Sequence, residues 1–153
     1  MKREEIRNIQ RLLKNTFNGS AWHGPTVLTI IQDVNYKLAF KSYPNIHSIA
    51  ELVDHITSWR RFAIERLKGN NSFEVIQDND WKRFTIKDEN SWEEIKAELI
   101  NSQKELEKEL DNTNDSKLSE LVDGKAYDFY TLLHGVIQHD IYHAGQISLL
   151  KKQ

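Results

Sequence analysis

The chain has 153 residues, of which 39% are hydrophobic and 29% charged, proportions that suit one globular domain with a substantial core. The 21 basic and 23 acidic residues are nearly balanced, so we expect no nucleic-acid partner. The chain contains no cysteine, which excludes disulfides, thiolate metal ligands and a nucleophilic thiol from the protein itself. The charged N-terminus lacks the apolar core of a signal peptide, and no apolar run reaches the roughly 20 residues of a membrane helix. We therefore expect a cytoplasmic protein with no membrane partner.

Hydrophobic residues spaced three and four positions apart predict four long amphipathic helices. The first spans residues 3–17 and ends where Asn18-Gly19-Ser20 breaks the pattern. Residues 21–47 then form a long crossover. Within it, Pro25 is expected to be the first residue of a short helix, because proline favours that position.

The second long helix opens at Ser48, where Ser48 and Glu51 have the spacing of a capping box, and it stops at Gly69. Residues 70–90 have the composition of a polar loop. Five apolar side chains are expected to anchor this loop: Phe73, Val75, Trp81, Phe84 and Ile86.

A third helix is predicted to start after Asn90 or Ser91 and to break at residues 111–114. Residues 126–151 form the fourth helix. Strand alternation and internal repeats are missing from the pattern. Four long helices with a long crossover between the first and second predict an all-α fold, a four-helix bundle that spans residues 1–153 as a single domain.

Three of the six histidines, His134, His139 and His143, lie on the last predicted helix. The apolar stripe of this helix runs through His139 and His143, one turn apart, whereas His134 lies about 200° around the helix from Val136 and faces away. Two imidazoles at i and i+4 can each direct a nitrogen at one ion. A pair of core histidines with satisfied hydrogen bonds is the alternative.

A third ligand is expected from a facing helix, because bundle cores build metal sites from several helices. His55 lies at the edge of the apolar face of the second long helix, and no other helix offers a histidine on its buried side. It therefore completes a predicted ligand set with His139 and His143. A boundary residue hydrogen-bonded to water is the other interpretation of His55. His23 and His47 fall in the crossover, where they could approach the mouth of the site.

The residues around these histidines resemble a known family. HSIAELVDHITSWR, which contains His55, and HDIYHAGQISLLKK near the C-terminus resemble the DinB/YfiT-like superfamily of bacterial metal-binding four-helix bundles. AWHGPTVL, at residues 21–28, resembles the same point in one subfamily of short bacillus-type members. The resemblance runs essentially from end to end.

The resemblance implies that His55, His139 and His143 hold a divalent ion, with zinc or nickel expected before manganese, and that the chain forms a homodimer. The activities it implies are bacillithiol S-transfer, mycothiol-dependent isomerisation or metal-dependent hydrolysis, although many members have no known reaction.

Three neutral imidazoles leave a bound ion with its net charge and an open coordination position, as in catalytic zinc sites. Such an ion deprotonates a bound water or thiol near neutral pH. Because the chain has no cysteine, a thiol nucleophile would have to arrive as a cosubstrate. The leading hypothesis is thus a metal-dependent enzyme that acts on a small molecule by thiol transfer. The alternatives are a metal-dependent hydrolase, which would use bound water, and a non-catalytic metal-binding module of a stress response.

Other side chains are candidates for catalysis (His23, Asp140 and Gln146) or for cofactor binding (Trp22, Trp59 and Tyr142). Asp140 could accept a hydrogen bond from a histidine of the facing helix, or could instead pair helices or face solvent. Tyr142 and Gln146 could line the pocket or the dimer seam. Trp22 and His23 could cap the pocket from the crossover, with His23 as an acid, a base or an extra ligand. Ordinary packing and surface exposure are the alternative for both.

Overall fold

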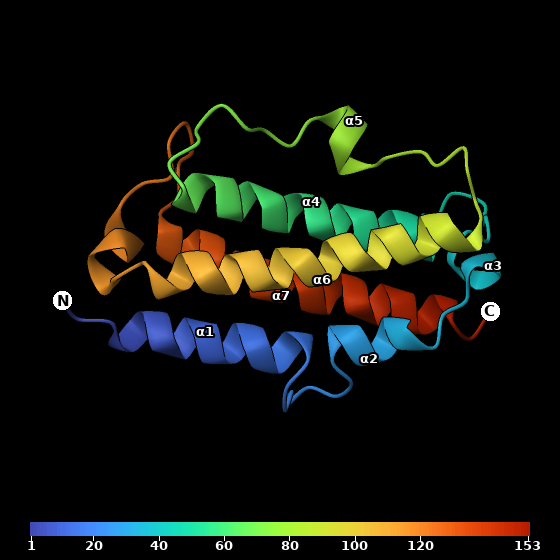
Figure 1. Ribbon diagram of the computed structural model, residues 1–153, viewed down its shortest axis with the longest axis horizontal. Helices are drawn as coiled ribbons and strands as arrows, with labels where there is room; N and C mark the ends of the chain where they lie inside the picture. Colours follow the sequence, from blue (N-terminus) through green and yellow to red (C-terminus); the bar gives the residue numbers. More distant parts are fainter.

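The computed structural model describes all 153 residues, and every regular element in it is helical. Four long helices run side by side: α1 (Glu4–Phe17), α4 (Ile49–Leu67), α6 (Glu89–Asp111) and α7 (Phe129–Leu150) (Figure 1). The connections hold the short helices α2 (Val27–Gln32), α3 (Tyr36–Ala39) and α5 (Gln77–Asp80), and the 3-10 turn η1 (Asp115–Ser119). The predicted all-α four-helix bundle, with a crossover between the first two long helices, is confirmed.

The crossover has a structural purpose, because α1 is shorter than the helix it covers. α1 has 14 residues and α7 has 22, and both α1 and α2 pack against α7. α2 lies end to end with α1 and covers the part of α7 that α1 does not reach (Figure 1). On the opposite side of the bundle, the long connection that carries α5 passes over α4 (Figure 1). None of the helices combines the length and the apolar composition that crossing a bilayer requires.

The predicted capping box of α4 is present. Ser48 Oγ accepts a hydrogen bond from the backbone N–H of Glu51 at 3.3 Å, and the Glu51 carboxylate accepts one from the backbone N–H of Ser48 at 2.7 Å. The predicted start of the short crossover helix at Pro25 is wrong. α2 begins at Val27, because Thr26 accepts from the backbone N–H of Thr29 and so occupies the N-cap position.

Two other predicted helix starts are also displaced, in each case because an aspartate acts as the N-cap. α6 begins at Glu89 rather than after Asn90, since the Asp88 carboxylate accepts from the backbone N–H of Ser91 at 2.8 Å. α7 begins at Phe129 rather than at residue 126, since Asp128 accepts from the backbone N–H of Thr131 at 2.8 Å. An N-cap residue has non-helical dihedrals, so it marks where the helix can begin.

The loop before α6 is anchored by four of the five predicted apolar residues. Ile86 is the exception, because 64% of its surface is exposed. The others are partly buried, and the aromatic ring of Phe84 meets that of Phe40 edge to face at 5.7 Å.

The buried apolar side chains form two clusters, one toward each end of the bundle. One cluster contains the α4 residues from Ile49 to Ile56 and the α7 residues from Ala144 to Leu150. The other contains the α4 residues from Phe62 to Ile64 and the α7 residues from Phe129 to Ile137. Between the two clusters lies a layer of buried polar side chains, which we call the polar layer: His55, Arg60, Ser102, Gln103, Asp140 and His143.

An ion pair at the centre of the polar layer joins three helices. Arg60 of α4 and Asp140 of α7 have no exposed surface, and the guanidinium donates from Nη2 at 2.7 Å and from Nε at 3.1 Å to the carboxylate. Arg60 Nη1 also donates to Gln103 Oε1 of α6 at 2.8 Å. The core of the bundle is therefore held by directional contacts at its middle and by apolar packing on either side.

Candidate metal centre

Three imidazoles converge at one end of the polar layer. His139 Nε2 lies 3.0 Å from His55 Nε2 and 3.1 Å from His143 Nε2, and one ligand atom from each of the three residues lies within 4.8 Å of the other two. Nitrogen ligands at about 2.05 Å from a tetrahedral zinc ion lie about 3.3 Å apart. The two Nε2 separations from His139 are close to this value, so the three residues form a group that could hold a shared divalent ion.

The hydrogen bonds made by the other ring nitrogens decide where the protons lie. His55 Nδ1 faces two oxygens of Asp80, the backbone carbonyl at 2.9 Å and the carboxylate at 2.8 Å. His143 Nδ1 faces Gln146 Oε1 at 2.7 Å. All of these oxygens are acceptors, so both Nδ1 atoms carry the proton of the neutral ring and both Nε2 atoms present lone pairs.

The third ring, His139, cannot donate a hydrogen bond to both His55 Nε2 and His143 Nε2. His139 has one proton in its neutral form, so at most one of the two close Nε2 contacts is a hydrogen bond. A satisfied pair of core histidines would need a donor at each contact. The three rings instead leave more nitrogen lone pairs than N–H groups at this point. A bound cation would satisfy these lone pairs.

The environment favours the neutral form of two of these rings, His139 and His143. Burial, together with the neighbouring imidazoles of His143 and His55, lowers the pKa of His139 to about 3. Burial also lowers the pKa of His143, against an opposing contribution from its hydrogen bond to Gln146. Neutral imidazole is the form that binds a metal ion, so both rings are ready to act as ligands at neutral pH.

α5 lies beside α4 (Figure 1) and supplies the acceptor that orients His55. Three side chains of α4 hold α5 in place. Besides His55, Ser58 Oγ donates to the backbone carbonyl of Asn79 at 2.5 Å, and Trp59 Nε1 donates to the Asp80 carboxylate at 3.0 Å. A carboxylate that accepts from the far nitrogen of a ligating histidine is a recurrent partner in metal sites. Asp80 was not predicted from the sequence, because it lies 25 positions from His55 in a one-turn helix within a connection that has no repeating pattern.

Trp81, the residue after Asp80, covers one face of His55. The two rings are parallel within 6° and their centroids are 3.8 Å apart, while the ring of His47 stacks on the opposite face of Trp81 at 3.7 Å. His47 thus comes close to the mouth of the site, but the indole separates it from His55. Trp81 was predicted only as a loop anchor, because a stacking partner cannot be identified from spacing.

Asp140 does not orient a histidine. Its carboxylate binds Arg60, so helix pairing is the role that the structure shows. Burial raises the pKa of the Asp140 carboxyl, and the guanidinium of Arg60 opposes that rise. Arg60 was not among the residues predicted to be buried, although it lies four residues after Ile56 and three before Ala63, which is the spacing of the apolar stripe.

The remaining candidates divide by location. Trp22 is 100% exposed, and His23 beside it is also exposed, in the loop between α1 and α2 on the side of the bundle opposite α5 (Figure 1). The structure therefore does not bring this pair to the three histidines. Tyr142 is largely exposed, although its ring centroid lies 5.0 Å from that of His143. His134 lies outside the cluster and its ring is 4.4 Å from that of Tyr130.

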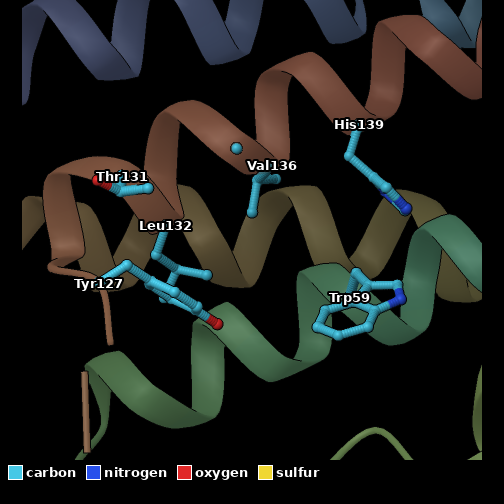
Figure 2. Close-up of a pocket in the computed structure, with 7 residues that line it drawn as sticks. Trp59, Tyr127, Thr131, Leu132, Val136 and His139 are labelled. Atoms are coloured by element: carbon cyan, nitrogen blue, oxygen red, sulfur yellow. The ribbon is translucent and has the colours of Figure 1, made fainter. Parts of the chain in front are cut away.

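Two cavities reach the cluster from different sides. A cavity of about 230 Å³ lies on the His139 side, between α4 and α7 (Figure 2). Its lining consists of Trp59, Tyr127, Thr131, Leu132, Gly135, Val136 and His139. A larger cavity of about 670 Å³ lies on the His143 side, where Trp81, Tyr142 and Gln146 contribute to its wall. A small molecule therefore has room beside the convergence point of the histidines.

The fold and the site define a helical bundle protein with a candidate three-histidine metal centre between two of its long helices. The sequence model of the DinB superfamily matches residues 32–147, which include all three histidines and Asp80, and the chain belongs to this family. Comparisons with curated proteins and with solved structures returned no match.

Proposed function

We propose that the protein is a divalent-metal-dependent enzyme that transfers a low-molecular-weight thiol, of the bacillithiol kind, to a small-molecule substrate. The observation that carries this proposal is the convergence of three Nε2 atoms, two of which have their lone pairs fixed by hydrogen bonds at Nδ1. Three imidazoles with no thiolate favour zinc or nickel over manganese, which prefers oxygen ligands.

The chain's own residues would prepare the site for such chemistry. A divalent ion with an open position lowers the pKa of a thiol or a water near it. Asp80 and Gln146 hold the rings of His55 and His143 in the orientation and tautomer that ligation needs. Trp81 shields one face of His55, while the cavities on the two sides leave space for substrate. With no cysteine in the chain, the thiol must be brought by the cosubstrate.

Metal content and a thiol-transfer assay test the proposal together. Protein purified without a histidine tag should contain about one zinc or nickel ion per chain by elemental analysis. Conjugation of a thiol to an electrophile should disappear on chelation, return on reloading, and be lost in His139→Ala but kept in His134→Ala. Background rates in every metal-loaded form would reject thiol transfer and leave the non-catalytic module. Ester hydrolysis with no thiol requirement would identify a hydrolase instead.

We also propose that the chain pairs into a homodimer through α7. The support is the pair of exposed apolar side chains Tyr142 and Leu149, which lie about 20° apart around that helix. Large apolar side chains that face solvent on one helix are typical of a surface that a partner covers.

A further inference from the structure

The cavity on the His139 side is apolar and ends at a candidate ligand. Trp59 comes from α4, Leu132 and Val136 come from α7, and Tyr127 comes from the segment just before α7 (Figure 2). His139 is the one imidazole in the lining, and no side chain that carries a charge at neutral pH contributes to it. An apolar group bound in this cavity would therefore lie next to the three-histidine cluster without leaving any charged side chain desolvated.

The size of the cavity limits what it can hold. An apolar cavity of about 150 Å³ in a protein core is large enough to bind benzene. The cavity here has a volume of about 230 Å³, which leaves room for an aromatic ring with a small substituent. Larger ligands would have to extend outward past Thr131, which is exposed.

The other side of the cluster has a different character. The cavity beside His143 adjoins one of about 720 Å³, and both are lined by His47 and Trp81. Arg83 and Lys87 line this further cavity, together with Glu51. A charged or polar cosubstrate is better accommodated there than an apolar group, because the cations would have to give up water to an apolar neighbour.

We infer that the His139-side cavity binds the apolar carbon group of the electrophile that receives the thiol, with a small aryl or alkyl group as its ligand class. This inference rests on the proposed function for the reaction, but the binding itself does not require turnover. For an organohalide as the electrophile, the transfer forms a carbon–sulfur bond and breaks the carbon–halogen bond. The halide leaves with its electron pair, and the thiol proton passes to solvent.

A glycine of α7 allows the cavity to be filled without disturbing the fold. Gly135 lines the cavity, and a Cβ added there meets no atom within 4 Å. Gly145, on the same helix, also has open space around its Cβ but lines neither cavity beside the cluster. Both positions are helical, so replacing glycine favours the helix to a similar extent in each case. Gly135→Leu and Gly145→Leu are therefore a matched pair.

Fluorobenzene is the probe, and fluorine NMR measures its binding to the metal-free and the metal-loaded protein. We expect Gly135→Leu to weaken fluorobenzene binding at least tenfold, whereas Gly145→Leu binds as the wild type does and zinc affinity is equal in all three proteins. Absence of fluorobenzene binding to the wild type, or equal binding to Gly135→Leu, would overturn the inference.

Steady-state kinetics then connect the cavity to the reaction. With benzyl chloride as electrophile, KM should rise at least tenfold in Gly135→Leu, while KM for iodomethane, which is small enough to avoid the added side chain, should stay within twofold. An equal rise for both electrophiles would contradict an aryl-binding role. If fluorobenzene binds as expected but no form transfers a thiol, the cavity stands and the proposed reaction fails.

Discussion

Asp80 holds His55 Nδ1 through two different oxygens, its backbone carbonyl at 2.9 Å and its carboxylate at 2.8 Å. The two residues belong to α5 and α4, so this contact links the orientation of a candidate ligand to the position of a one-turn helix in a long loop. The loop thereby becomes part of the site rather than a simple connection.

Removing the Asp80 carboxylate should weaken metal binding. Losing a residue that hydrogen-bonds a metal ligand, which we call an outer partner, typically reduces metal affinity by about 10–100-fold. We expect Asp80→Ala to reduce zinc affinity by about tenfold, because the backbone carbonyl remains as an acceptor. Isothermal titration against Asp78→Ala, an exposed carboxylate in the same short helix, provides the comparison. Equal affinities in the two variants would show that Asp80 does not support His55.

The ligand set can be tested one imidazole at a time. Alanine at His55, His139 or His143 should reduce zinc affinity by more than the 10–100-fold expected for an outer partner, because each removes a direct bond to the ion. His134→Ala should bind zinc as the wild type does, since His134 lies outside the cluster. Titration of zinc into the four variants decides the matter. Unchanged affinity in any of the first three would remove that residue from the set.

The pair formed by Arg60 and Asp140 should be costly to break. Asp140→Ala leaves a fully buried guanidinium without its carboxylate, so we expect urea denaturation to show a loss of about 3–5 kcal/mol. The double variant Arg60→Met/Asp140→Leu, which leaves no unpaired charge, should recover much of this loss. Glu120→Ala breaks an exposed pair with Lys117 and should cost less than about 1 kcal/mol. A loss of that small size in Asp140→Ala would mean that water reaches Arg60.

The metal-free protein should lose stability in acid. The pKa of His139 is about 3 in the folded chain, against about 6.5 in an unfolded one, so between these values the unfolded state binds more protons. The free energy of unfolding should thus fall as the pH drops from about 6.5 toward 3, and the lowered pKa of His143 adds to the effect.

Thermal melts at pH 7.5 and pH 5 measure the acid effect. His139→Gln, which cannot titrate there, should lose less stability over this range than wild type or His134→Gln. The same acid dependence in all three proteins would place the titrating groups elsewhere.

Sedimentation tests the homodimer. We expect a species of about twice 18.0 kDa at micromolar concentration. A glutamate introduced at Tyr142 or Leu149 should shift the population toward the monomer, because it places a charge on the exposed apolar surface of α7, whereas Lys104→Glu on α6 should not. A wild-type protein that sediments only at 18.0 kDa would rule out the pairing.

Local spacing was sufficient to single out the two candidate ligands of α7. His139 and His143 continue the apolar stripe of one helix, and helical periodicity depends only on neighbours in the sequence. The capping box at Ser48 was predictable for the same reason. Predicting His55 as a ligand required one more step. The helix that faces α7 had to be identified first, because only a histidine on that helix can reach the same ion.

The partners of these ligands were not predictable, because they depend on which segments meet in three dimensions. Asp80 and Trp81 reach His55 from a loop whose path over α4 leaves no periodic signal. Three roles stayed open for Asp140, because the sequence does not show which donor faces its carboxylate; that donor is Arg60. Trp22 and His23 were candidates to cap the pocket because they fall in the crossover, whereas their part of the crossover, the loop between α1 and α2, lies on the side of the bundle opposite α5 (Figure 1).

The polar layer also fixes the register of the helices. Two apolar helices can slide past one another by a turn, about 5.4 Å, and still find leucine and isoleucine partners of similar volume. Such a slip here would move Asp140 away from Arg60 and into an apolar cluster, and would separate His55 from the histidines of α7. Each of these changes leaves polar groups buried without partners, so one alignment of α4 against α7 is favoured over its neighbours. The geometry of the three imidazoles is then reproduced whenever the chain folds, even before an ion is available to enforce it.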